Sequence, residues 1–230
     1  MSSIILPTIN EYLDHRATDS PDRIWLRDRK GDEFTTWSWD QARSETHAVA
    51  AWLEAHFGVK GGDEGGTVLA ILSRNRAHWM LADMAIACSG NVSVPLFTTM
   101  IADTAKYLLE FTETKAIVVG EASNWEAVRS VLPEGTLVIA LPGVDPGVEH
   151  IRWEDILSDF SGASPSYQSS PTDLITLPFT SGTTGVPKGV IQTHESMLVP
   201  MQRGVDAFKI RELPRFLSYL PLAHIAERQL

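Results

Sequence analysis

One stretch of the chain reads Thr180-Ser181-Gly182-Thr183-Thr184-Gly185-Val186-Pro187-Lys188-Gly189, and it stands between two apolar runs, 174–180 and 189–193, that we expect to form strands. Glycines let a backbone adopt positive φ and approach a ligand closely, and successive N–H groups in such a turn bind phosphate oxygens. The Ser and Thr hydroxyls add donors. Pro187 fixes the backbone just before Lys188, whose ammonium adds a compact positive charge. The stretch therefore predicts a β-hairpin phosphate loop.

This loop differs from a Walker A loop, because two residues separate Gly185 from Lys188 and because a strand follows instead of a helix. A flexible hairpin rich in Ser, Thr and Gly is the plain alternative, and the Pro-Lys-Gly at fixed spacing disfavours it. The sequence contains no GxSxG, GxGxxG or HExxH motif. Serine hydrolases, Rossmann dehydrogenases and zincins require those residues, so these classes are excluded.

Outward from the loop, short β-rich runs alternate with helical patterns, which is typical of an α/β fold with a mostly parallel sheet flanked by helices. Further strands are expected at 24–27 and 34–37, which form a hairpin, and at 67–72, 92–96, 116–119, 137–141 and 215–220. Helices are expected at 40–57, 77–89, 103–111, 153–160, 196–208, from a capping box at 123–126 to 131, and from about 223 onward.

Residues 161–171 are rich in Ser and Pro and predict a surface loop or a joint between subdomains. We therefore expect an N-terminal α/β subdomain over 1–165 and, over 166–230, the start of a second subdomain that carries the phosphate loop. The last predicted helix has no Gly, Asn or Pro to end it, so we expect the 230 residues to be part of a longer protein.

The composition is globular and acidic: 43% of the 230 residues are hydrophobic, and 19 Lys and Arg face 29 Asp and Glu, for a net charge of −10. A protein that binds nucleic acid generally needs a basic surface, so nucleic acid is not an expected partner. Cys88 is the one cysteine, which excludes an intrachain disulfide and a Cys-based zinc site. With no secretory signal or membrane span, we expect a cytoplasmic protein.

At this point the sequence resembles a known family. Residues 180–189 resemble the phosphate-binding signature of the adenylate-forming superfamily, which contains acyl-CoA synthetases, luciferases and the adenylation domains of peptide synthetases. Residues 218–228, SYLPLAHIAER, resemble the next family motif in its long-chain fatty-acyl-CoA synthetase form. Weaker matches lie upstream, in family order, at Thr36-Trp37, at 73–76 with Trp79, and at 90–97. The resemblance covers nearly the whole chain and implies the N-terminal part of the synthetase fold.

The resemblance implies a two-step reaction, in which ATP and a fatty acid form acyl-AMP and pyrophosphate, and the acyl group then passes to coenzyme A. It implies that Lys188 neutralises the leaving pyrophosphate, that Thr180 contacts Mg²⁺, and that His224 lies on the acyl side of the site. The residues it assigns to the β- and γ-phosphates are Thr180, Ser181, Gly182, Thr183, Thr184, Gly185, Pro187 and Lys188. A fatty substrate also leaves peripheral membrane contact open, although no basic amphipathic helix is evident.

Several other polar or reactive residues are expected to be structural. Glu227 and Arg228 are expected to form an ion pair near a helix start, His194 to follow the helix cap at Thr193, and Cys88 to be a buried, inert thiol. Trp79, Met80 and Met84 are expected in the core and not along an acyl-chain tunnel.

The later family motifs are missing from the 230 residues: the acidic Mg²⁺ residue, the ribose-binding aspartate and the small C-terminal domain with its catalytic lysine. The resemblance therefore implies that the chain cannot complete adenylation by itself. Two alternatives stay open. One is an acyl-AMP ligase that loads a carrier protein instead of coenzyme A. The other is a truncated, non-catalytic module that binds a nucleotide or a partner.

Overall fold

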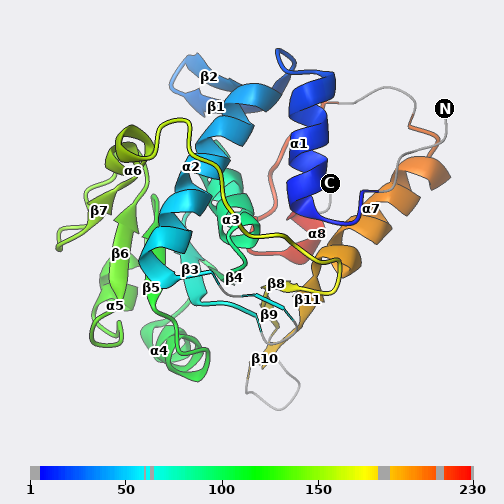
Figure 1. The fold of residues 1–230 in the computed structure, drawn as a ribbon. Coiled ribbons are helices and arrows are strands. Elements are labelled where there is room, and N and C mark those ends of the chain that lie inside the picture. The colour runs from blue at the N-terminus through cyan, green and yellow to red at the C-terminus, as the bar shows by residue number, and fades with distance from the viewer. Residues whose placement is uncertain (1–5, 60, 63–64, 181–186, 211–214, 229–230) are drawn as a thin grey trace.

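The computed structural model describes residues 6–59, 61–62, 65–180, 187–210 and 215–228. Its centre is a seven-stranded sheet in the order β11-β8-β4-β3-β5-β6-β7, parallel except for the antiparallel edge strand β11 (Figure 1). The strands are β3 (Val68–Leu72), β4 (Val92–Leu96), β5 (Ala116–Val119), β6 (Leu137–Ala140), β7 (Ile151–Arg152), β8 (Leu174–Thr176) and β11 (Gln192–Thr193). The predicted α/β fold with a mostly parallel sheet is confirmed.

Helices cover both faces of the sheet. The list is α1 (Ile9–Asp19), α2 (Trp39–Phe57), α3 (Ala77–Cys88), α4 (Ala102–Phe111), α5 (Trp125–Arg129), α6 (Trp153–Asp159), α7 (His194–Ala207) and α8 (Ile225–Arg228). Leu69 and Ile71 of β3 pack with α2, α3 and α6, whereas Ala70 and Leu72 pack with α4 and α5 on the other face. This alternation follows from the two-residue period of a strand, and it produces two apolar cores.

Local sequence explains the longest helices. Ser38 and Gln41 form a reciprocal capping box at the start of α2, and Gly58, with φ of +80°, ends it. In α3 nearly every residue is buried, because this helix lies between the sheet and α2. A helix that is apolar all round belongs in the interior, as its sequence indicates.

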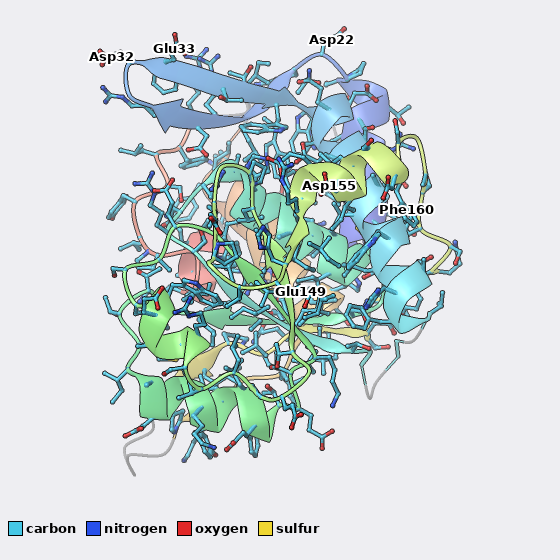
Figure 2. The ribbon with its side chains drawn as sticks, turned by 90° about the vertical axis from the view of Figure 1, so that its left-hand side faces the viewer. Asp22, Asp32, Glu33, Glu149, Asp155 and Phe160 are labelled. Atoms are coloured by element: carbon cyan, nitrogen blue, oxygen red, sulfur yellow. The ribbon has the colours of Figure 1, made fainter. Side chains whose placement is uncertain are left out.

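Two antiparallel ribbons complete the described structure. β1 (Ile24–Lys30) pairs with β2 (Glu33–Ser38), and β9 (Phe179–Thr180) pairs with β10 (Lys188–Gly189). Both hairpins were predicted. Figure 2 shows Asp32 and Glu33 at the tip of the first ribbon and Glu149 and Asp155 lower on the same side of the molecule, all of them exposed. This side carries part of the chain's negative charge.

The order of the strands fixes where a ligand site lies. β4 lies beside β3 on one side, and the chain then crosses over to form β5 on the other side of β3. The strands stay parallel, but the order in which they are added to the sheet reverses at β3. In such sheets ligands bind outside the carboxyl ends of the strands near the reversal. Gly120, directly after β5, packs so closely on Ser73, after β3, that an added Cβ would lie 2.0 Å from the Ser73 Oγ. Glycine is therefore required at this edge.

Some expected elements are wrong or incomplete. Residues 215–220 form no strand, and Leu217 is 84% exposed, because no strand in the described part of the chain pairs with this apolar segment. The run 174–180 is two strands, because β8 pairs within the large sheet and β9 pairs with β10; 189–193 is divided in the same way. Helix α1 and the two-residue strand β7 were not predicted.

The predicted capping box at 123–126 is also wrong. The Ser123 hydroxyl donates to the carbonyl of Thr98 (3.1 Å), and the Asn124 amide donates to the carbonyls of Phe97 (3.2 Å) and Met100 (2.8 Å). These side chains therefore bind the loop after β4, and α5 has Asn124 as its N-cap residue with no side-chain cap bond and ends at Arg129.

The Ser- and Pro-rich segment 161–171 runs across the C-terminal part of α2 (Figure 1). The Glu54 carboxylate accepts hydrogen bonds from the backbone N–H groups of Ser166 and Tyr167, both 2.8 Å. The Tyr167 hydroxyl binds the Asp173 carboxylate and accepts from the Gly62 N–H (3.3 Å). β8 and β11 lie after residue 165 and belong to the same sheet as β3 to β7. The subdomain boundary at 165 stays a prediction.

Candidate nucleotide-binding site

The β9–β10 hairpin carries the two ends of the predicted phosphate loop. Thr180 and Lys188 are register partners, and the Thr180 hydroxyl donates to the Lys188 carbonyl at 3.5 Å. Both residues are exposed, as a residue that contacts a soluble anion must be. The intervening predicted residues, Ser181, Gly182, Thr183, Thr184 and Gly185, lie outside the described residues, and Pro187 is half-buried just before β10.

Packing fixes the base of this hairpin. Phe179 packs against the core on the α4 face of the sheet, and its ring meets Phe111 of α4 edge to face at 6.2 Å. A Cβ at Gly189 would lie 3.1 Å from the Phe179 ring, so the opposite strand presses on the same side chain. The two ends of the loop therefore extend from an anchored platform.

The hairpin projects from the carboxyl edge of the sheet. Leu177, which follows β8, donates its N–H to the carbonyl of Ser93 in β4 at 2.8 Å, and Val190 donates to the carbonyl of Pro178 at 2.9 Å. β8 runs parallel to β4, so the hairpin leaves the sheet at the edge where β3 and β4 also end. This is the edge at which the sheet order places a ligand.

A cleft of about 310 Å³ lies at the same edge. Its lining comes from the segments after β3 and β4 and from the 218–223 segment: Ser73, Arg74, Asn75, Leu96, Phe97, Thr98, Ser218, Tyr219, Pro221 and Ala223. The polar lining and the apolar rings together suit a ligand that has both a polar and an apolar part.

Asn75 holds the 218–222 segment to the sheet. Its amide nitrogen donates to the Ser218 hydroxyl (3.0 Å) and to the Leu220 carbonyl (2.6 Å), and its oxygen accepts from the Leu222 N–H (2.9 Å). From the sequence, Asn75 was named only as part of the motif match at 73–76, and no role was predicted for it. This role joins residues about 145 positions apart, and nothing local in the sequence indicates such a contact.

His224 lies beside the cleft. Its side chain is exposed, and its ring meets the ring of Phe97, a lining residue, edge to face with centroids 4.7 Å apart. Its backbone N–H donates to the Pro221 carbonyl at 2.8 Å, which closes the turn before α8. The structure thus brings His224 to the carboxyl end of β4, while its predicted acyl-side role stays a prediction.

The expected ion pair between Glu227 and Arg228 is wrong. Arg228 pairs instead with Asp83 of α3, with 2.5 Å between Nη2 and Oδ2, and both side chains are almost fully buried. The reason is geometric, because neighbouring residues on a helix point in different directions. Arg228 also lies over the Trp79 ring, with its guanidinium carbon 5.4 Å from the centroid.

The structure confirms the expected core positions of Cys88, Trp79, Met80 and Met84. Cys88 is fully buried, and burial raises the pKa of its thiol, which keeps it protonated and inert. Trp79 and Met84 lie in the cores, and Met80 packs against the larger one.

Among the described residues, no group of three or more His, Cys, Asp or Glu side chains is placed to hold a metal ion. None of their helices has the length and apolarity that crossing a bilayer requires.

The sequence pattern of the family described as AMP-binding enzyme matches residues 13–230. The chain belongs to the AMP-binding enzyme family. The match includes both the hairpin that carries Lys188 and the 218–228 segment that carries His224.

Curated relatives of this AMP-binding enzyme chain include long-chain and fatty acyl-CoA synthetases. A peroxisomal long-chain acyl-CoA synthetase 6 of Arabidopsis thaliana is 30% identical over 240 residues, covering 97% of this chain and 34% of that protein. Fatty acyl-CoA synthetase A of Dictyostelium discoideum is 32% identical over 222 residues, covering 90% of this chain and 32% of that protein. The chain therefore spans about a third of the length of these relatives.

Solved AMP-binding enzymes share the fold. Acetoacetyl-CoA synthetase from Streptomyces lividans superposes with a TM-score of 0.81 at 22% identity, covering 97% of this chain and 36% of that chain. O-succinylbenzoate coenzyme A synthetase from Bacillus subtilis, in complex with AMP, gives 0.68 at 25% identity, covering 95% and 51%. These likenesses agree with a mostly parallel sheet flanked by helices.

His194, which begins α7 directly after the edge strand β11, is a buried structural group in this AMP-binding chain. Its ring is fully buried, and Nδ1 accepts a hydrogen bond from the Ile9 N–H at 3.1 Å, which ties α7 to α1. Burial lowers the pKa of His194 from 6.5 to about 4, and the charge of Asp173 opposes this only partly. The neutral ring is therefore the form that folding requires.

We expect this histidine to make the fold acid-sensitive. Its folded pKa of about 4 lies below its ordinary value of 6.5, so between these values the unfolded chain binds a proton that the folded chain excludes. The stabilisation is complete above pH 6.5 and is lost as the pH falls toward 4. At about 1.4 kcal/mol per pKa unit, the loss amounts to about 3 kcal/mol. Urea unfolding at several pH values measures it.

The matched control is His194→Asn, because an Asn side-chain oxygen takes the place of Nδ1 as acceptor and does not titrate. Its free energy of unfolding should fall less steeply than that of the wild type in this pH range. Parallel slopes for the two proteins would contradict the assignment.

Proposed function

We propose that this chain is the N-terminal part of a long-chain fatty-acyl-CoA synthetase, and that its β9–β10 hairpin binds the β- and γ-phosphates of ATP. The observation that carries the proposal is the anchored hairpin with exposed Thr180 and Lys188, at the carboxyl edge that also holds the cleft and His224. The relatives named long-chain acyl-CoA synthetases and fatty acyl-CoA synthetase support the substrate class.

The chemistry assigned to the hairpin is charge stabilisation. A carboxylate oxygen of the fatty acid attacks the α-phosphorus of ATP, and the bond from that phosphorus to the bridging oxygen breaks, so negative charge builds up on pyrophosphate. The Lys188 ammonium stabilises this charge as it develops, and preorganised donors of this kind lower the barrier most in a site that excludes water. The thiol of coenzyme A then attacks the acyl carbon and displaces AMP.

Mg²⁺ fits the same hairpin. Thr180 offers a hydroxyl oxygen at an exposed position, and Mg²⁺ prefers oxygen ligands while it remains bound mainly to nucleotide phosphates and water. When bound, the ion supplies positive charge to the phosphate oxygens. In the proposed site Thr180 therefore adds one ligand to an ion that arrives with ATP.

His224 is proposed to contact the fatty acid near its carboxylate. Its ring stands on Phe97 at the cleft, and Tyr219 and Pro221 supply apolar surface beside it. An imidazole beside such a cleft can donate a hydrogen bond to a carboxylate while the neighbouring rings receive the first methylenes.

Exposed apolar side chains support the view that the synthetase continues beyond these residues. Phe208 is 81% exposed, Phe216 60%, Leu217 84% and Tyr219 75%. Clusters of large exposed apolar residues generally mark surfaces that another polypeptide covers. In the proposed synthetase the remaining two-thirds of the protein covers them. Cytoplasmic location and peripheral membrane contact stay predictions.

The proposal is tested with the 230-residue chain and with the polypeptide encoded when the reading frame is followed past Leu230. The 230-residue chain with ATP, Mg²⁺, palmitate and coenzyme A should form no thioester above background, whereas the longer polypeptide should form palmitoyl-CoA. Turnover by the shorter chain would refute the view that it is only a part. Acyl-AMP release without transfer to coenzyme A would favour carrier-protein loading, and a stop codon after Leu230 would favour a non-catalytic binding module.

A further inference from the structure

We propose that Arg228 is a positioning residue, whose buried contacts with Asp83 and Thr176 fix helix α8 against the strand that leads into the phosphate hairpin. The inference rests on the proposed function for its catalytic consequence, while its structural consequence is measurable on this chain alone. It assigns to Arg228 the task of setting the distance between His224 and the hairpin.

The contacts join elements that are far apart in the sequence. Arg228 Nη2 lies 2.5 Å from Asp83 Oδ2 in α3, and Nη1 donates to Thr176 Oγ1 in β8 at 3.0 Å. The Arg228 side chain is 3% exposed and that of Asp83 10%. One guanidinium thus binds a helix on one face of the sheet and a strand within it.

Ser93 of β4 completes the network. Its hydroxyl donates to the second Asp83 oxygen, Oδ1, at 2.6 Å, and the Thr176 hydroxyl donates to the Ser93 carbonyl at 3.1 Å. Both carboxylate oxygens are therefore bound, and Thr176 accepts from Arg228 while it donates to Ser93. Arg228 Nε is buried without a hydrogen-bond partner, so the directional bonds of the network are those of the two Nη atoms, the Asp83 carboxylate and the Ser93 and Thr176 hydroxyls. Buried bonds of this kind specify one geometry closely.

The network lies between the two predicted parts of the site. Thr176 is the last residue of β8, and Phe179 begins the hairpin three residues later. On the other side, His224 immediately precedes α8 and lies four residues before Arg228. A displacement of the guanidinium would therefore move the base of the hairpin and the His224 turn relative to each other.

A role in positioning explains a charge pair that stability alone does not require. Removing two charges from water costs several kcal/mol per ion, so apolar residues of similar volume are often as stabilising as a buried ion pair. An apolar pair at positions 83 and 228 cannot bind Thr176 and Ser93 in a fixed direction, because it has no directional donors or acceptors. Geometry and stability can thus be separated by substitution.

The structural test compares the 230-residue chain with its Asp83→Leu/Arg228→Met double variant by amide hydrogen exchange. The melting temperature should change little. Exchange at the Leu177 and Val190 amides, which bond to the Ser93 and Pro178 carbonyls, should become about tenfold faster because the platform opens more often. Unchanged exchange at these amides in a stably folded double variant would overturn the proposal.

If the double variant does not fold, Thr176→Val decides the question. It keeps both the volume at that position and the Asp83–Arg228 pair, and it removes the Thr176 hydroxyl with its bonds to Arg228 and Ser93. The same faster exchange at Leu177 and Val190 is expected, and no change would refute the role of Thr176. Arg152→Met is the matched control, since Arg152 is exposed in β7 at the opposite edge of the sheet. It should leave the hairpin amides unaffected.

The catalytic test uses the longer synthetase. The double variant should lower kcat for pyrophosphate release about tenfold, because small misplacements of reacting groups are costly, and should change the KM for palmitate far less. Arg228→Lys, which keeps the charge but lacks the fork that reaches both partners, should give an intermediate kcat. A normal kcat in the double variant would refute positioning. An inactive wild type would refute the proposed function instead, while the exchange result would still decide the structural claim.

Discussion

Replacing Lys188 with alanine is expected to lower kcat/KM for acyl-AMP formation by about 100-fold in the synthetase, the effect of removing one preorganised donor from a developing charge. Lys188 begins β10 at the anchored base of the hairpin, and its side chain is exposed to an incoming nucleotide. The loss should be largest where charge accumulates, which is on the departing pyrophosphate. Steady-state pyrophosphate release with palmitate and ATP measures it.

Two variants make this test specific. Lys188→Arg should recover only part of the activity, because a planar guanidinium cannot occupy the place of a compact ammonium. Lys115→Ala is the matched control, since Lys115 is also exposed but precedes β5 at the amino-terminal edge of the sheet. Its kcat/KM should stay at the wild-type value. A change of less than twofold in Lys188→Ala would remove Lys188 from the mechanism.

The second large effect concerns stability. Glu45 of α2 has a side chain that is 13% exposed, and its carboxylate binds two indoles. Trp153 Nε1 donates to Oε1 at 2.7 Å, and Trp37 Nε1 donates to Oε2 at 3.0 Å. His78 Nε2 lies 3.3 Å from Oε1. The carboxylate thereby joins α2 to β2, α3 and α6 inside the larger apolar core.

Glu45→Gln is expected to lower the free energy of unfolding by about 3 kcal/mol, since it removes the charge and turns an amide NH₂ toward an indole N–H, leaving a buried donor unpaired. Urea unfolding near neutral pH measures the change. Glu134→Gln, at an exposed position, should have an effect close to zero. A Glu45→Gln effect as small as that of the control would show that the two indole bonds contribute little.

The pH dependence of this difference has a definite sign. Burial alone would raise the pKa of Glu45, but the hydrogen bond and charge of His78 and the two indole N–H groups together lower it below 4.5. The stabilisation is therefore present above pH 4.5 and is lost as the pH falls through the folded pKa. The gap between wild type and Glu45→Gln should narrow in acid. Both proteins share His194, so its titration cancels in the comparison.

Much of the sheet is predictable because its strands are apolar runs separated by glycine-ended helices, as in 92–96 after Gly90. Helix α1 escaped prediction because its sequence, INEYLDHRATD, is mostly polar and only Leu13 and Ala17 are buried. The strand predicted at 215–220 was wrong for the opposite reason. Its apolar residues suggest a strand, but in the described chain no neighbouring strand pairs with it.

The parts of the site formed by consecutive residues were predictable, and the parts formed by contacts between distant residues were not. The hairpin at 180–189 carries its chemistry in consecutive residues. The contacts of Asn75 with the 218–222 segment and of Asp83 with Arg228 depend on the sheet order, and no spacing in the sequence reports them. For Glu45 a signal did exist: it lies three residues after Ala42 and four before Val49, both buried, so a charge stands on the apolar stripe of α2.

The position of β8 beside β4 has a consequence for the order of assembly. Ser93 and Thr176 meet across 83 residues of chain, and β4 is already held by β3, its neighbour in both sequence and space. During synthesis from the N-terminus, β3, β4 and the helix between them emerge well before β8 does. The β3–β4 surface on which the phosphate hairpin packs is therefore synthesised before the hairpin, and β8 and the hairpin after it are added to a sheet whose first strands already exist.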